Sequence, residues 1–219
     1  PAGTITLFPV TLSGFTAVTN EEPTHDGFDE ESDTDLLQRY YERLRTPATS
    51  GNKVHYLIWA KEVPGVGDAR VVPLWEGPNT VKVIIIDANR QPASTQLVQA
   101  VQDHIDPNAS GLGEGVAPIG AVATVVSADG LEVDISVDVV METGYTEQQV
   151  EENIAASLTE YFRKIAFVES IVSYARVGAA ILNSPGVADY SNLTMNGGVA
   201  NISIQDDEVA ILGDLAVTF

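Results

Sequence analysis

The segment EVPGVGDARVVPLWEGPNTVKVIII, residues 62 to 86, combines clustered glycines with a run of β-branched residues. A phosphate-binding loop needs a third glycine between a strand and a helix, or a lysine followed by serine or threonine. Here the glycines precede Asp68, whose carboxylate would repel a phosphate, and the residues before them have helical spacing. We therefore interpret Pro64 and Gly65 as a turn from a helix into a β-hairpin, with Val81 to Ile86 as its buried strand.

The residues on either side of this segment show alternating helical and strand periodicity. Apolar residues spaced as on one helix face predict helices near 36–44, 53–63, 94–105, 146–164 and 168–182. Ser32 with Asp35, and Thr146 with Gln149, have the spacing of capping boxes before two of them. Alternating or β-branched runs predict strands near 70–75, 80–86, 121–127, 131–141, 199–204 and 208–219, and an edge strand or short hairpin at 4–18.

Asp129 and Gly130 link two of these runs and have the composition of a tight hairpin turn. In the second run one face is apolar, formed by Val133, Ile135, Val137 and Val139. The other face carries Glu132, Asp134, Ser136 and Asp138. The alternation predicts a hairpin with one buried side and one wet, acidic side.

The turn at residues 64–68, PGVGD, has a near copy at 185–189, PGVAD. Each copy follows a predicted helix and precedes strands, so we interpret the pair as a duplicated helix, turn and hairpin unit. The predicted fold class is α+β, with short helices packed on antiparallel hairpins. The glycine- and proline-rich loop at 106–120 divides it into subdomains at 21–106 and 107–219, after the end of a β region at 1–20.

The chain is strongly acidic, with 31 acidic and 11 basic residues and a formal charge of -20. Such a surface repels nucleic acids and anionic membranes, so we expect neither as a partner. The charge serves solubility, reflects a salt-adapted source, or helps to dock basic partners, and composition alone does not choose among these. The absence of cysteine excludes disulfides and thiolate metal sites. No stretch approaches the roughly 20 apolar residues of a transmembrane helix.

The sequence offers no catalytic, cofactor-binding or metal-binding constellation. His25, His55 and His104 are isolated, and we expect His55 to be a packing residue. The acidic loop NEEPTHDGFDEESDTD lacks the ligand order and the glycine of an EF-hand. We expect Trp59, on a predicted helix, to pack in the core, whereas Trp75, beside a turn, is the candidate interaction residue.

Several motifs occur together in DEESDTDLLQRYYERLRTPATSGNKVHYLIWAKEVPGVGDARVVPLWEGPNTVKVIIID. They are an acidic loop before a helix that ends in Leu-Arg, then PATSGN at 47–52, WA at 59–60, EVPGVG at 62–67, PLWEGP at 73–78 and the strand at 81–87; PIGA at 118–121 and GYT at 144–146 follow. With these motifs the chain resembles the baseplate J-like family of contractile phage tails and related injection machines. The resemblance covers nearly the whole chain as the C-terminal portion of a longer protein, so we expect residues before Pro1.

The resemblance implies a non-enzymatic structural component of a baseplate wedge, in the virion tail and assembled in the host cytoplasm. Its implied partners are copies of itself and other wedge and hub proteins, in a ring that controls contraction of the tail sheath. It implies no cofactor. A non-catalytic adhesin, or a module that binds the envelope or glycans, is the alternative that the acidic hairpin and the tryptophans leave open. Self-association favours the first hypothesis, and saturable glycan binding favours the second.

Overall fold

The computed structural model describes residues 2–6, 17–22, 32–45 and 49–219. The chain divides into two compact units, Pro1–Tyr41 and Glu42–Phe219. Helix α1 (Asp33–Arg45) is capped by Ser32 as predicted, because the Ser32 hydroxyl donates to the Asp35 carboxylate (2.7 Å) and accepts from the Asp35 N–H (3.2 Å). The strand expected at 4–18 falls largely outside the described residues, and so does His25.

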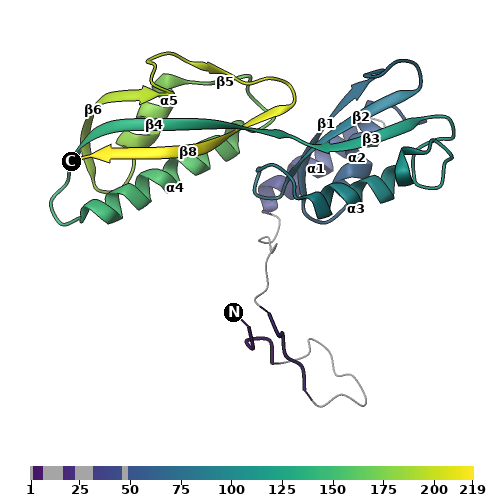
Figure 1. Ribbon diagram of the computed structural model, residues 1–219, viewed down its shortest axis with the longest axis horizontal. Coiled ribbons are helices and arrows are strands. Elements are labelled where there is room, and N and C mark those ends of the chain that lie inside the picture. Colours follow the sequence, from purple (N-terminus) through teal and green to yellow (C-terminus); the bar gives the residue numbers. More distant parts are fainter. Residues whose placement is uncertain (1, 7–16, 23–31, 46–48) are drawn as a thin grey trace. The chain divides into compact units, whose positions relative to one another are not determined.

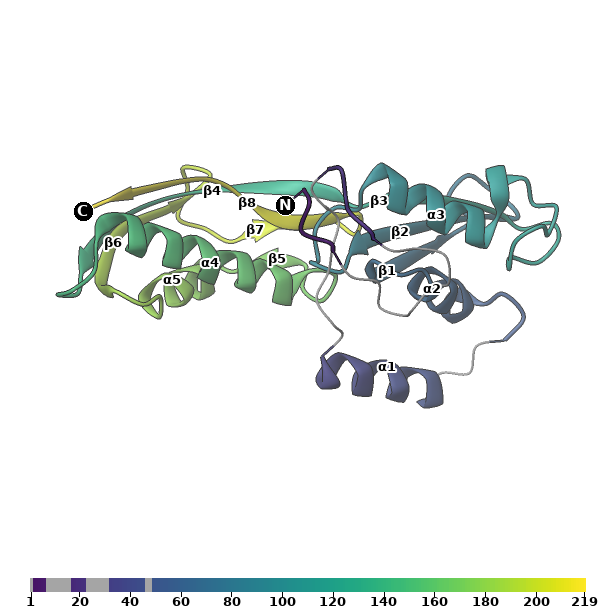
Figure 2. The ribbon, with the colours of Figure 1, turned by 90° about the horizontal axis from the view of Figure 1, so that it is seen from below.

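The first sheet of the larger unit has the strand order β1-β2-β3, with two helices packed on one of its faces (Figures 1 and 2). Its elements are α2 (Lys53–Glu62), β1 (Val66–Pro73), β2 (Thr80–Asp87), α3 (Thr95–Ile105), the short 3-10 helix η1 (Pro107–Ala109) and β3 (Val122–Ser127). β1 is antiparallel to β2, whereas β3 is parallel to it. Alternation along β2 turns Val83 and Ile85 toward α2 and α3, and Ile84 and Ile86 toward a separate core cluster.

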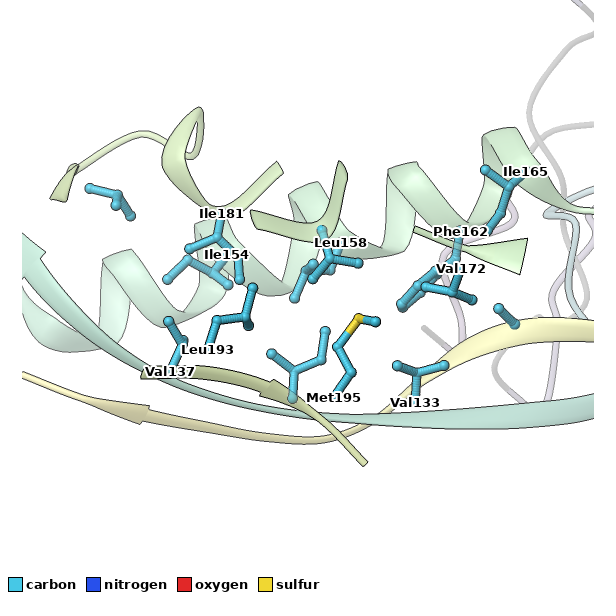
Figure 3. Packing of buried hydrophobic residues seen from close by; sticks show 14 of the residues in the cluster. Val133, Val137, Ile154, Leu158, Phe162, Ile165, Val172, Ile181, Leu193 and Met195 are labelled. Atoms are coloured by element: carbon cyan, nitrogen blue, oxygen red, sulfur yellow. The ribbon is translucent and has the colours of Figure 1, made fainter. Parts of the chain in front are cut away.

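The second sheet has the order β6-β4-β8, and α4 and α5 cover one face of it. The elements of this part of the chain are β4 (Asp129–Met141), α4 (Glu147–Ile165), β5 (Ile171–Val172), α5 (Tyr174–Leu182), β6 (Val187–Met195), β7 (Ile202–Ser203) and β8 (Glu208–Thr218). β5 and β7 form a separate two-stranded sheet. Figure 3 shows Ile154, Leu158 and Phe162 of α4 directed toward the sheet, where Val133 and Val137 of β4 face them. The predicted capping box of Thr146 and Gln149 is confirmed.

The predicted hairpin between residues 121 and 141 is wrong. β3 and β4 lie in different sheets, and Asp129 and Gly130 belong to β4, where they pair with Glu208 and Val209 of β8. The chain stays extended because each sheet supplies a partner for it: the Ala128 N–H donates to Ile85 O and the Asp129 N–H to Asp207 O. The acidic and apolar alternation along β4 is nevertheless as predicted, since Val133, Ile135, Val137 and Val139 are buried.

The repeated turn is formed twice with the same geometry. Val66 N–H donates to Val63 O and Val187 N–H to Ser184 O, each at 3.2 Å, across a proline and a glycine. The glycines have positive φ, 99° in Gly65 and 88° in Gly186, which that turn requires. The second hairpin of the proposed duplication is not formed, because β6 pairs with β4 and β7 pairs with β5.

The α+β class is confirmed, but two predicted boundaries move. The helix expected at 168–182 begins at Tyr174, because residues 171–172 pair as β5 with β7. β3 follows the loop at 106–120 and yet belongs to the first sheet, so the change of sheet falls at Ala128. We therefore propose subdomains at 49–127 and 129–219 in place of 21–106 and 107–219. Among the described helices, none has the length and apolar character needed to cross a bilayer.

Candidate interaction surface

Two loops lie at one end of the first sheet. Residues 74–79 connect β1 to β2, and residues 106–121 precede β3. Because β2 and β3 are parallel, both strands start at this end, and the Val122 N–H donates to Asn79 O at 2.9 Å. The two loops are therefore neighbours, although residues 80–105 lie between them in the sequence.

The loop that holds Trp75 has a well-defined backbone. The Leu74 N–H donates to Thr80 O (2.7 Å) and the Gly77 N–H to Leu74 O (3.1 Å). The Thr80 hydroxyl accepts from the Glu76 N–H and donates to Gly77 O. Leu74 has a φ of 58°, which is costly for a leucine, and its side chain is 65% exposed. These bonds hold Leu74 and Trp75 at the tip of the hairpin.

The two tryptophans have the different environments that the sequence indicated. Trp59 stacks on His55, with ring centroids 4.4 Å apart, and meets the edge of Tyr56, so it is a packing residue. Trp75 is 37% exposed, and the Lys82 ammonium lies 5.8 Å from the centroid of its ring. A cation at this distance is attracted to the indole face. An interaction role for Trp75 stays a prediction.

Asp106, a residue that the sequence did not single out, anchors the second loop. Its carboxylate is buried and accepts hydrogen bonds from the Gly111 N–H, the Ala123 N–H and the Ser110 hydroxyl. A buried carboxylate satisfied by backbone donors is a structural group. Its signal in the sequence was weak, because an acid before a Pro-Asn pair is ordinary loop composition.

Gln102 of α3 completes this anchor. Its amide nitrogen donates to Asp106 O (2.6 Å) and Ala123 O (2.8 Å), and its amide oxygen accepts from the Val125 N–H (2.8 Å). One side chain therefore ties the end of the helix to the start of β3. The backbone of the loop is fixed at its base by these bonds.

Beyond the anchor, the loop exposes apolar side chains. Ile119 is 84% exposed and Leu112 66%. Ile119 lies directly over Gly113, since a Cβ on that glycine would come within 2.6 Å of it. With the hairpin tip, they form what we call the loop-end surface, which consists of Leu74, Trp75, Leu112, Val116 and Ile119. Exposed apolar side chains at one end of a sheet make this a candidate binding surface.

The acidic face of β4 has a structural use. β6 and β8 both lose register beside β4, near Asn192 and Gly213 respectively. Asp138 accepts from the Asn192 amide at 2.6 Å, and Asp134 accepts from the Asp214 N–H at 2.9 Å. These carboxylates therefore supply acceptors where the bulged neighbours lack ladder partners.

The described histidines and carboxylates form no obvious reaction centre. His104 Nε2 lies 3.1 Å from Glu62 Oε2 and links α3 to α2, while His55 Nδ1 accepts from the Gly51 N–H. Among the described residues, no three histidine or carboxylate side chains are grouped as metal ligands would be. The chemistry of the loop-end surface is that of contact: apolar area, an indole face and nearby carboxylates.

Comparisons with known proteins assign the fold. Residues 48–127 match the model of the baseplate J-like central domain, and residues 133–218 match that of the baseplate J-like protein C-terminal domain. The two matches fall on the first and second sheets in turn. The chain belongs to the baseplate J-like family.

Curated relatives agree with this assignment. The phage-like element PBSX protein XkdT of Bacillus subtilis is 42% identical over 207 residues, which cover 94% of this chain and 59% of that protein. Baseplate protein gp47 of Escherichia phage Mu is 34% identical over 113 residues, 49% of this chain and 29% of that protein. The chain thus spans less than two thirds of these relatives.

A solved structure shares the fold. A chain of the anti-feeding prophage baseplate superposes with a TM-score of 0.54 at 16% identity, covering 97% of this chain and 48% of that one. At this level of identity the likeness concerns the fold, and it extends over both sheets.

Proposed function

We propose that the chain is a structural part of a contractile-tail baseplate wedge, which assembles with copies of itself and with other wedge and hub proteins into the ring that controls sheath contraction. The observation that carries this proposal is the succession of both family domains, one on each sheet. The place of action is the tail baseplate, after assembly in the host cytoplasm.

The structure supports a mechanical rather than a catalytic role. Among the described residues, several charged side chains serve the fold, as Asp106, Asp134 and Asp138 do. The loop end exposes apolar side chains beside carboxylates. A rigid scaffold with an apolar contact surface suits a subunit that holds neighbours in place.

The proposal is tested by antibody labelling of intact contractile particles from the source organism, viewed by electron microscopy beside particles from a deletion strain. We expect label at the tail end, and no assembled baseplates in the deletion strain. Restoring the gene on a plasmid controls for effects on its neighbours. Particles that assemble normally without this protein would contradict the wedge role.

A glycan-binding module is the second candidate, because the exposed indole of Trp75 could stack on a sugar ring. This hypothesis predicts that the protein binds saturably to a glycan array. Trp75→Ala should abolish that binding, and Trp59→Phe should leave it unchanged. Label on cell envelopes rather than on tails would favour this second function.

A further inference from the structure

The loop-end surface is prepared for contact, since its apolar side chains stand on backbone that is already ordered. Leu74 is fixed by its bonds to Thr80 and Gly77, and the loop of Ile119 is tied down by Asp106. Binding to such a surface loses little conformational entropy, because the residues have few arrangements left to lose. An apolar segment of a partner would therefore bind to a surface whose backbone is already in place.

The charges around this surface are negative. Glu76 and Glu114 are exposed within the two loops, and no lysine or arginine occurs between Gln91 and Phe162. Lys82 lies over Trp75, but its ammonium is 3.7 Å from the Asp207 carboxylate, which offsets its charge. A partner that brings lysine or arginine to the rim would meet complementary charge.

A second copy of this chain is poorly suited to supply that positive charge. Most basic side chains between residues 49 and 219 already form ion pairs with the chain's own carboxylates, namely Lys61, Arg70, Lys82, Arg90, Arg163, Lys164 and Arg176. Copies with a formal charge of -20 repel each other. Contact between two copies at this surface would bring carboxylates together.

We propose that the loop-end surface binds a segment of a different protein, in which apolar side chains stand beside lysine or arginine. The proposal rests on the proposed function, because it places that partner in the same assembled tail. It assigns Ile119, Leu74 and Trp75 to the apolar contact, and Glu76 and Glu114 to the charged rim.

The test is photo-crosslinking in assembled tails that contain the full-length protein. Benzoylphenylalanine replaces Ile119 in one preparation and Leu182, an exposed residue at the end of α5, in another. The tails are purified and irradiated, and the crosslinked peptides are sequenced by mass spectrometry. We expect position 119 to capture a peptide of another protein that has lysine or arginine within a few residues of the crosslink.

Charge reversal gives a second measurement. Glu76→Lys with Glu114→Lys should lower the crosslink yield at position 119 about tenfold, which corresponds to one decade of affinity. Glu151→Lys with Glu152→Lys changes the net charge equally on the exposed side of α4 and should leave the yield unchanged.

The outcomes separate the two proposals. Capture of a second copy, capture of an acidic segment, or no capture at position 119 in tails that contain the protein would overturn this inference and leave the wedge function standing. Tails that lack the protein altogether would overturn the wedge function, and the inference with it.

Discussion

At the scale of single residues, the two copies of the turn differ at one instructive position. Gly67 in the first copy corresponds to Ala188 in the second. A Cβ on Gly67 would lie 2.1 Å from the backbone oxygen of Asp87, because the pairing of β1 with β2 is irregular there. Ala188 is exposed, so its methyl group is accommodated.

Gly67→Ala is therefore expected to lower the free energy of unfolding by about 3 kcal/mol, since backbone must move to admit the methyl group. The matched change, Ala188→Gly, should cost less than about 1 kcal/mol, which is the entropic cost of glycine in a strand. Urea denaturation followed by circular dichroism measures both. Equal losses would show that the close approach at Gly67 relaxes without cost.

Tyr56, which is buried, and Tyr161, which is partly buried, form another matched pair. The Tyr56 hydroxyl is buried and has no hydrogen-bond partner among the residues that the structure describes, whereas the Tyr161 hydroxyl accepts from the Ser173 N–H at 3.0 Å. Tyr56→Phe should leave the protein as stable or up to about 1 kcal/mol more stable, because it removes an unpaired polar group. Tyr161→Phe should cost about 1 kcal/mol in the same denaturation assay. A larger loss from Tyr56→Phe would contradict this ranking.

Tyr56 also predicts how the stability of the fold changes at alkaline pH. Burial, and then the negative charge of Asp106, raises the pKa of Tyr56 above its usual value of 10.0. The folded protein then holds this proton more tightly than the unfolded chain does. Its contribution to stability is complete below pH 10 and is lost as the pH rises through the folded pKa. Tyr56→Phe should reduce the fall in stability above about pH 10, as measured by urea midpoints across that range.

At the scale of elements, Arg70 of β1 joins the two sheets. Its guanidinium donates to Phe167 O (3.1 Å) and Asp206 O (2.8 Å), and lies 4.7 Å from the centroid of the Phe167 ring. Around it, a separate apolar cluster contains residues from both subdomains, namely Ile84, Ile86, Ala128, Ala166 and Val209. The planar, multiply donating guanidinium suits this position in a way that an ammonium does not.

Arg70→Lys is expected to raise hydrogen exchange at residues 166–168 and 205–207 and to lower stability by about 1–2 kcal/mol, since the planar guanidinium contacts are lost. Arg90→Lys is the control, because Arg90 pairs with Asp68 at 3.1 Å within the first sheet. Mass spectrometry of the exchanged peptides compares hydrogen exchange at these residues in the two variants. Exchange that rises uniformly over both sheets would argue against a local joint.

The elements that could be predicted from sequence are those fixed by neighbouring residues. Ser32 and Thr146 cap their helices through bonds that span three residues, so spacing alone located them. Strand pairing is decided elsewhere: Asp129 and Gly130 have the composition of a turn, but β8, which lies about 80 residues further along the chain, holds them extended. No local pattern could show that.

Of the candidate surface, the sequence pointed to Trp75, from its place beside a turn. Its indole is partly exposed, and its interaction role stays a prediction. Ile119 was not, because an isoleucine in a loop gives no sign of its direction. The side chain of Ile119 is exposed because Asp106 anchors the loop and because Gly113, which has no Cβ, lets Ile119 lie against its backbone. Both are tertiary features.

At the scale of the whole molecule, the excess of 31 acidic over 11 basic residues stores electrostatic repulsion in the folded state. Raising sodium chloride from about 20 mM to about 200 mM should therefore raise the melting temperature by about 2–4 °C, as screening relieves that repulsion. Differential scanning calorimetry measures it. The exposed ion pairs of Glu160 oppose the trend weakly, so a fall in melting temperature would mean that ion pairs outweigh repulsion.

β3 passes into β4 through Ala128, and each of these strands has a parallel partner, β2 in one sheet and β8 in the other. Tension applied along this segment therefore crosses both sheets without meeting a loop that could stretch. It loads the two parallel ladders in shear, so that many hydrogen bonds must slip together instead of opening in turn as in a peeled hairpin. The segment therefore resembles a tie between the two sheets, because continuous strand backbone carries a pull from one sheet to the other.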